Sequence, residues 1–162
     1  MTAYPSVNPD LDLVLERTVD VAPELVWRAW TTPELVVRWF APKPWSTSSC
    51  EIDLQPGGRF HTVMRSPEGT EYPSTGCILV VEEGRTLVFT SGLGPGFRPQ
   101  VGTDGDFPFT AVIRIERSGN GTKYTATAIH ADASAKQSHE KMGFVEGWGT
   151  ALDQLVETVR GL

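Results

Sequence analysis

A long run of alternating apolar and polar residues, from position 48 to 131, constrains the fold more than any other feature of this sequence. Alternation with a period of two is typical of β-strands that bury one face. Short stretches such as QPGG, SPEGTEYP, EGR and GNG divide the run, and their glycines and prolines suit tight turns. Since short connections join antiparallel neighbours, the run predicts a meander. Strands are expected over residues 49–54, 58–65, 74–83, 86–92, 109–118 and 122–131.

The segments on either side of this run complete the fold prediction. Alternation over 11–19 predicts one further strand, and the stretch APELVWRAWTTPELVVRWFAP that follows predicts two short helices in series. The second of these starts at Pro33, because proline suits the first turn of a helix and not its interior. Seven strands with one long C-terminal helix predict an α+β fold, in which a curved antiparallel sheet wraps around the helix and buries its apolar face.

The C-terminal helix is expected to be amphipathic and about 22 residues long. Its apolar stripe consists of Phe144, Trp148, Leu152, Leu155 and Val159. Gly143, Gly147 and Gly149 lie in the same segment, although each glycine costs a helix interior about 1 kcal/mol relative to alanine. A large Trp148 between glycines fits a helix that touches the sheet at one place and stands off it elsewhere. Alternatively, the glycines admit a neighbouring element to close contact.

Five stretches of the chain carry a resemblance to a known superfamily. They are APELVWRAWTTPELVVRWFAP, EIDLQPGGRF, PEGTEYPSTGCILVVEEGRTLVFT, GNGTKYTATA and GFVEGWGTALDQL. They resemble the helix-grip (SRPBCC) superfamily of START lipid-transfer domains, birch-pollen-allergen-like proteins and polyketide cyclases. Within it, the branch named for activators of the Hsp90 ATPase (AHSA-like) is the most similar. The resemblance implies a helix-grip fold with an apolar cavity between sheet and long helix, in a single domain over 11–162 after a flexible segment 1–10.

Aromatic and small side chains are expected to line that cavity. Strand periodicity puts Phe60 and Met64 on one face, and Phe109, Ala111 and Ile113 on another, opposite Trp148. Ligand pockets are mainly apolar with few polar groups, which matches this composition. Plain core packing is the alternative for each residue singly. The expected lining residues are Trp27, Trp30, Trp39, Phe60, Met64, Phe89, Phe109, Ala111, Ile113, Tyr124, Phe144, Trp148 and Leu152.

Four residues are candidates for acid–base chemistry, which needs imidazoles or carboxylates in a cleft. His130 shares a strand face with Tyr124 and could lie at one end of the cavity. Glu51 and His61 would form a second pair if their strand faces pointed inward. If they point outward, Glu51 and Asp53 are expected to pair with Arg59, His61 and Arg65 across the ladder. The third histidine, His139, is expected in solvent at the start of the long helix.

Composition and motifs argue against several other classes of function. The formal net charge of −6 argues against a nucleic-acid partner, which needs clustered Lys and Arg. No residues have the spacing typical of metal ligands, and no phosphate-binding loop, dinucleotide fingerprint or nucleophile elbow occurs. Neither a metal nor a cofactor is therefore expected. No secretory signal or membrane-length apolar run is present, which predicts a cytoplasmic protein. Cys50 and Cys77 are expected to be reduced, with a disulfide between neighbouring strands as the alternative.

These observations leave three functions, ranked in the following order. The first is binding of a small hydrophobic or aromatic molecule, gated by the glycine-rich loop over 92–108. The second is a protein-interaction module, either stress-related and co-chaperone-like or a homodimer, favoured if the apolar residues of VVRWFAPKPW are exposed. The third is a cofactor-free cyclase or hydrolase. Whether the chain is an enzyme is left open, with a binding role preferred.

Overall fold

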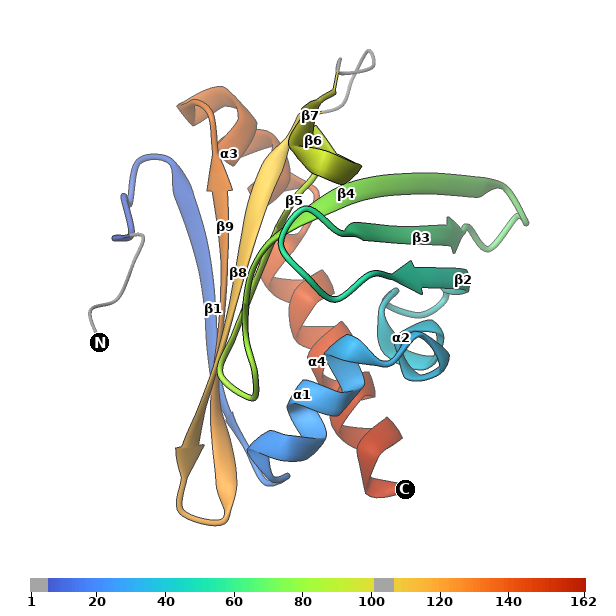
Figure 1. Ribbon diagram of the computed structural model, residues 1–162, viewed down its shortest axis with the longest axis vertical. Coiled ribbons are helices and arrows are strands. Elements are labelled where there is room, and N and C mark those ends of the chain that lie inside the picture. Colours follow the sequence, from blue (N-terminus) through green and yellow to red (C-terminus); the bar gives the residue numbers. More distant parts are fainter. Residues whose placement is uncertain (1–5, 101–106) are drawn as a thin grey trace.

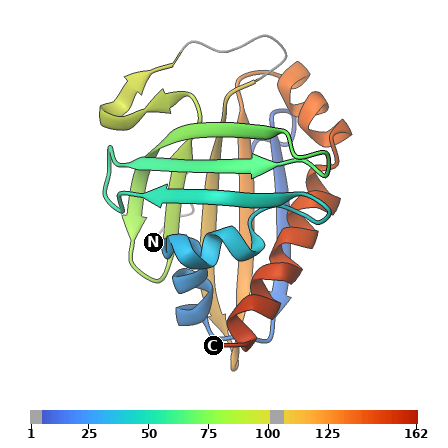
Figure 2. The ribbon, with the colours of Figure 1, turned by 90° about the vertical axis from the view of Figure 1, so that its right-hand side faces the viewer.

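A seven-stranded antiparallel sheet dominates the computed structural model, which describes residues 6–100 and 107–162 (Figure 1). The strand order is β1-β9-β8-β5-β4-β3-β2. The strands are β1 (Asp12–Val19), β2 (Ser46–Ile52), β3 (Arg59–Arg65), β4 (Glu71–Glu82), β5 (Thr86–Thr90), β8 (Phe109–Ser118) and β9 (Gly121–His130). The sheet is bent, so that β2, β3 and the first part of β4 cross the direction of β8 and β9 (Figure 2). These strands confirm the predicted meander and the α+β fold class.

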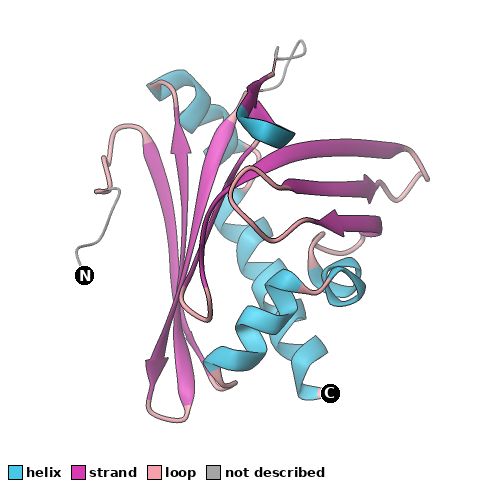
Figure 3. Ribbon diagram, in the orientation of Figure 1, coloured by secondary structure: helices cyan, strands magenta, loops and turns pink. Residues whose placement is uncertain are grey.

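Four α-helices accompany the sheet in the part of the chain that the structure describes. Figure 3 distinguishes them in cyan from the strands. They are α1 (Pro23–Thr31), α2 (Pro33–Trp39), α3 (Ala133–Lys141) and α4 (Phe144–Arg160). Pro23 and Pro33 each occupy the first turn of a helix, where the missing N–H is not needed. The two short helices in series are therefore confirmed.

The long C-terminal helix is confirmed as α4, although it begins at Phe144 and has 17 residues, fewer than the sequence predicts. Gly143 has a φ of +89°, in the left-handed region that ends an α-helix, and it separates α3 from α4. α3 starts independently, because the side chain of Asp132 accepts a hydrogen bond from Ala135 N at 2.8 Å. α3 therefore folds against the end of β9, and only α4, with 17 residues, crosses the sheet.

Part of the glycine-rich loop over 92–108 is anchored to the sheet. Residues 93–100 form a small hairpin of β6 (Leu93–Gly94) and β7 (Arg98–Pro99) around the 3-10 turn η1 (Pro95–Phe97). Gly96 N donates to Gly57 O at 2.8 Å, and Gln100 Nε2 donates to Thr75 O at 2.8 Å. Residues 101–106 of the loop lie outside the described part, and the expected gating role of the loop stays a prediction. The predicted division of the chain into a flexible segment 1–10 and a single domain over 11–162 also stays a prediction.

The two cysteines lie on strands that are not neighbours, which excludes the disulfide alternative. β3 separates β2 from β4, and Cys50 pairs with Thr62 in the ladder while Cys77 pairs with Arg59. Both thiols are free. Burial, followed by the negative charges of Glu34 and Glu51, raises the pKa of the Cys50 thiol to about 12. Cys50 is therefore protonated at neutral pH and is a poor nucleophile.

Trp30 is at the centre of the core between α1, α2 and the sheet. Its ring centroid lies 4.8 Å from that of Trp39 and 5.7 Å from that of Phe89, which itself stacks on Phe60 at 4.5 Å. The indole Nε1–H of Trp30 donates to the hydroxyl of Tyr124 at 3.1 Å. Such aromatic pairs contribute about 0.5–1.5 kcal/mol each beyond their burial. This cluster fixes α1 and α2 against β5 and β9.

Gln154 of α4 ties the helix to the segment that follows α2. Its Nε2 donates to Trp39 O at 2.9 Å and to Ala41 O at 2.8 Å, and its Oε1 accepts from Lys43 N at 3.0 Å. Three main-chain groups at the end of α2 and just after it are thus satisfied by one side chain. This amide sets the position of α4 relative to α2.

Replacement of Gln154 by methionine, which has a similar shape and no amide, is expected to destabilise the protein. The change leaves the partners of Gln154 unpaired at a partly buried site, which costs about 1–3 kcal/mol. Urea unfolding should show a lower midpoint for Gln154→Met. Gln137→Met, on an exposed face of α3, should leave the free energy of unfolding within about 0.5 kcal/mol of that of the unmodified protein. Equal midpoints for the two variants would contradict the assigned role of Gln154.

Candidate functional site

The residues expected to line a cavity lie together on the inner side of the bent sheet. All of them except Met64 and Ala111 belong to one contiguous apolar core or pack against it. Ala111 is fully buried on β8, and Met64 is half-buried on β3. Phe89, Phe109 and Trp148 are only partly buried at the margin of this core. The structure therefore brings the expected residues together, and their role as a cavity lining stays a prediction.

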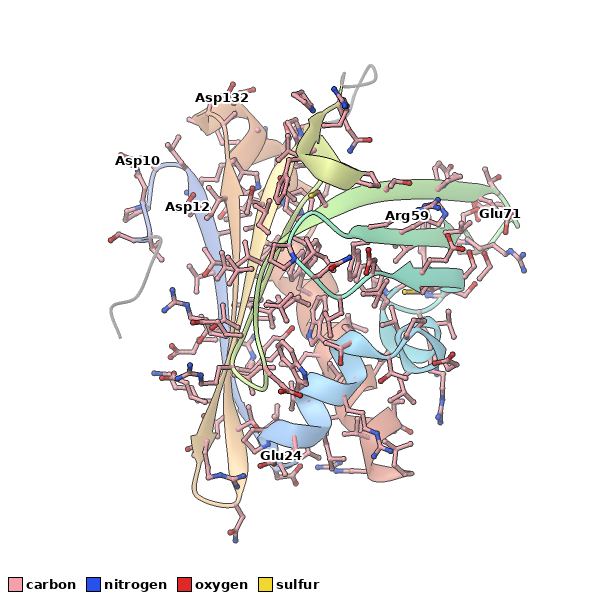
Figure 4. The ribbon with its side chains drawn as sticks, viewed as in Figure 1. Asp10, Asp12, Glu24, Arg59, Glu71 and Asp132 are labelled. Atoms are coloured by element: carbon pink, nitrogen blue, oxygen red, sulfur yellow. The ribbon has the colours of Figure 1, made fainter. Side chains whose placement is uncertain are left out.

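Two histidines meet at the end of the molecule where β1 begins and β9 ends. Asp10, Asp12 and Asp132 lie at this same end (Figure 4). His130 Nε2 lies 2.9 Å from His139 Nδ1, and His130 Nδ1 lies 2.7 Å from Leu11 O. The expectation of a solvent-exposed His139 is wrong, because the break at Gly143 turns α3 onto β9 and leaves the residue only 7% exposed.

Aromatic rings enclose the His139 imidazole. The ring centroids of Phe109, Phe144 and Phe107 lie 4.8, 5.1 and 5.2 Å from that of His139, and the Trp148 centroid lies at 6.3 Å. Burial, reinforced by the neighbouring His130, lowers the pKa of His139 to about 4. His139 is therefore a neutral imidazole at pH 7, surrounded by apolar rings and oriented by a second histidine.

Tyr124 lies on the same face of β9 as His130, further from the end of the strand, and has a structural role. Its side chain is buried, and its hydroxyl accepts the hydrogen bond from Trp30. Burial raises the pKa of Tyr124 far above that of a free phenol, although the bond from Trp30 opposes the shift. A hydroxyl that stays protonated and is already bonded to the core is a poor base.

The Glu51 and His61 pair lies on the outer face of the sheet. The two residues are opposite each other in the ladder, as predicted, but Glu51 forms an ion pair with Arg59 at 3.3 Å and its side chain is 63% exposed. His61 Nδ1 lies 2.7 Å from Thr75 Oγ1. The cross-strand network is confirmed for Glu51 and Arg59, and the exposure of Glu51 does not favour a buried acid–base role.

Two members of the predicted network take other partners. Arg65 pairs with Glu71 at 3.0 Å, and Asp53 accepts from Gln55 Nε2 at 2.8 Å. Both interactions are exposed to solvent. Figure 4 labels Glu71, the partner of Arg65, near the end of β4 that is far from β8 and β9. Exposed ion pairs of this kind contribute about 0–1 kcal/mol, so they solubilise this edge more than they stabilise it.

One polar side chain inside the bend has no partner. Thr47 on β2 is 8% exposed, and its Oγ1 is the one enclosed side-chain polar atom without a hydrogen bond in the described part of the chain. It lies opposite Met64 in the ladder. Within residues 6–100 and 107–162, no group of three or more His, Cys, Asp or Glu side chains suits a metal ion. None of the described helices is long and apolar enough to cross a membrane.

Comparison with known proteins gives a consistent result. The chain matches the family described as Activator of Hsp90 ATPase homolog 1-like protein over residues 20–160. The crystal structure of protein NE0264 from Nitrosomonas europaea is 46% identical, with a TM-score of 0.91 over 96% of this chain and 97% of that chain. The AHSA1-like protein from Aeromonas hydrophila is 25% identical, with a TM-score of 0.69 over 93% of both chains. No curated protein is found to match.

The depressed pKa of His139 predicts an acid-sensitive stability. Between its ordinary pKa of 6.5 and about 4, the unfolded chain binds a proton at this residue that the folded chain does not. The free energy of unfolding should therefore be at its full value above pH 6.5 and fall as the pH drops towards 4. The slope is at most about 1.4 kcal/mol per pH unit.

Urea unfolding at a series of pH values measures this slope. His139→Asn keeps a side-chain N–H that can donate to His130 and cannot be protonated, so it should flatten the dependence. His61→Asn, at the half-buried histidine of β3, is the matched control for the exchange of a histidine for asparagine. A slope that persists in His139→Asn would assign the acid sensitivity to another group.

Proposed function

We propose that this chain, which belongs to the family of Activator of Hsp90 ATPase homolog 1-like proteins, binds a small hydrophobic or aromatic ligand between the sheet and α4. Members of this family often bind hydrophobic ligands or act as co-chaperone-like modules. The fold alone does not distinguish these roles, since one scaffold hosts many functions. The support for ligand binding comes from the first two turns of α4.

Open glycines beside Trp148 carry the proposal. A Cβ added at Gly147 would meet only Pro42 Cγ, at 3.9 Å, and a Cβ added at Gly149 would meet no atom within 4 Å. Both glycines have ordinary helical backbone, so neither a close approach nor a positive φ requires them. Each costs the helix about 1 kcal/mol relative to alanine. Free space on both flanks of a half-buried tryptophan suits a ligand that lies against its indole.

The surfaces next to Trp148 have the chemistry of a site for an aromatic molecule. Its ring lies 4.8 Å from Phe144 and 6.1 Å from Phe109, centroid to centroid. The small side chains of Ala111 and Ala128 are fully buried and are opposite each other in the ladder between β8 and β9. Ligand sites combine such apolar surface with few polar groups. Here His139, which packs against Phe109, Phe144 and Trp148, supplies such a polar group.

The structure gives less support to the other two functions. Trp39 is 2% exposed and belongs to the core, while Phe40 and Trp45 are half-buried, so this segment does not offer the contiguous apolar surface expected of an interaction module. The side chains of His130 and Tyr124 are engaged within the fold. The ranking of binding before interaction and catalysis is therefore kept. The cytoplasmic location and a homodimer stay predictions.

Substitution of Gly147 tests the proposed site. Gly147→Ala should raise the free energy of unfolding by up to about 1 kcal/mol, because the helix gains propensity without a clash. Gly147→Leu should also fold, but its longer side chain should fill the space beside Trp148 and abolish ligand binding. Native mass spectrometry of the freshly purified protein identifies a co-purified small molecule, and thermal shift with hydrophobic and aromatic compounds measures binding.

Two further variants control this experiment. Gly149→Ala should stabilise the fold in the same way as Gly147→Ala, since its surroundings are open. Trp148→Ala removes the proposed contact surface and should weaken binding without adding bulk. If Gly147→Leu unfolds the protein, the space is occupied by the core; if it binds every ligand as before, the proposed site is wrong.

A further inference from the structure

We propose that His139 Nε2 is a hydrogen-bond acceptor that selects aromatic ligands carrying a neutral hydroxyl group, such as phenols. This inference rests on the proposed function and names the ligand class for the same site. It follows from the order of hydrogen bonds through the two histidines, from the rings around His139, and from the chemistry of a neutral imidazole.

The Leu11 carbonyl fixes the tautomer of both histidines. A carbonyl oxygen only accepts, so His130 Nδ1 carries the proton that it donates to Leu11 O at 2.7 Å. In a neutral His130, Nε2 is then an acceptor, and the 2.9 Å contact requires His139 Nδ1 to be the donor. The proton of neutral His139 is thereby placed on Nδ1, and its Nε2 carries a bare lone pair.

His139 Nε2 is available to a ligand. This nitrogen makes no hydrogen bond to any described residue. It is also not fully enclosed, because Thr47 Oγ1 is the one fully enclosed side-chain polar atom without a partner in the described part of the chain. An acceptor that is neither bonded nor sealed off is free to receive a proton donor. Phe109 and Trp148, both partly buried, flank the imidazole and provide faces on which a planar ring can stack.

The lone pair and the apolar enclosure together restrict the ligand class. A carboxylate would place its own lone pairs against Nε2 and would be repelled. An ammonium group could donate, but moving a charge among aromatic rings without a counter-ion costs much more than one hydrogen bond returns. A neutral O–H donor satisfies Nε2 at the smallest desolvation cost. An aromatic ring carrying that hydroxyl also uses the adjacent ring faces.

The tautomers can be measured without any ligand. Long-range proton–nitrogen NMR correlation on the ¹⁵N-labelled protein at pH 7.5 should show both His130 and His139 protonated at Nδ1. Free histidine favours the Nε2 tautomer, so this result is specific to the geometry of the pair. Protonation of His139 at Nε2 would overturn the proposal, because that atom would then be a donor.

Binding of two matched probes tests the ligand class. 2-Naphthol and 2-methoxynaphthalene share the ring system, and only the first has an O–H donor. Titration calorimetry should show 2-naphthol binding about tenfold more tightly to the unmodified protein, as one net hydrogen bond predicts. In His139→Asn, which keeps a donor for His130 and has no atom at the Nε2 position, the two affinities should become equal. His61→Asn should keep the tenfold ratio.

The possible outcomes separate this inference from the proposed function. If both probes bind the unmodified protein equally, or if the ratio survives in His139→Asn, a hydrophobic site exists but His139 does not select its ligand. If neither probe binds, both the proposed site and this inference fail. Thermal melting of each variant, run beside the titrations, confirms that the affinities refer to folded protein.

Discussion

The left-handed backbone at Gly143 is the constraint on which the candidate site depends. Because φ is positive there, the chain leaves α3 and starts α4 in a new direction, and glycine adopts this conformation without a Cβ penalty. α3 is thereby placed against β9, so that His139 meets His130. The same break sets the first two turns of α4, where Phe144 and Trp148 pack beside His139. One backbone conformation thus assembles residues from β9, α3 and α4.

Burial of the His130–His139 pair requires support from the surrounding main chain. His130 donates to Leu11 O just before β1, and Lys136 of α3 donates to Pro9 O at 2.8 Å. The start of the first strand is therefore held by both the last strand and α3. Loss of the hydrogen bond from His130 to Leu11 O would leave a nitrogen of His130 buried among aromatic rings without a partner, which is costly. The position of His139 is consequently coupled to the order of the N-terminal segment at residues 9–11.

Local patterns predicted the fold, whereas contacts between distant residues decided the site. The strands follow from a period of two and from turn residues, and both are local properties of the sequence. His139 was missed because its burial depends on how α3 docks; the signal that could have revealed it was Gly143, placed inside a presumed helix. Gln154 gave no signal either, since its three main-chain partners lie more than 100 residues away in the sequence. The outward direction of Glu51 and His61 did follow from strand alternation, once Phe60 was known to face the core.

The glycines of α4 have a thermodynamic consequence for the free protein. Gly147 and Gly149 together lower the stability of the helix by about 2 kcal/mol relative to alanine, with no compensating contact at either position. A ligand that binds only the folded state, at 100 times its Kd, would add about 2.7 kcal/mol and offset that loss. Under the proposed function, the ligand-free protein would be the less stable form, and ligand binding would offset the cost of the open space beside Trp148. This balance is typical of functional sites, where stability is given up for a specific geometry.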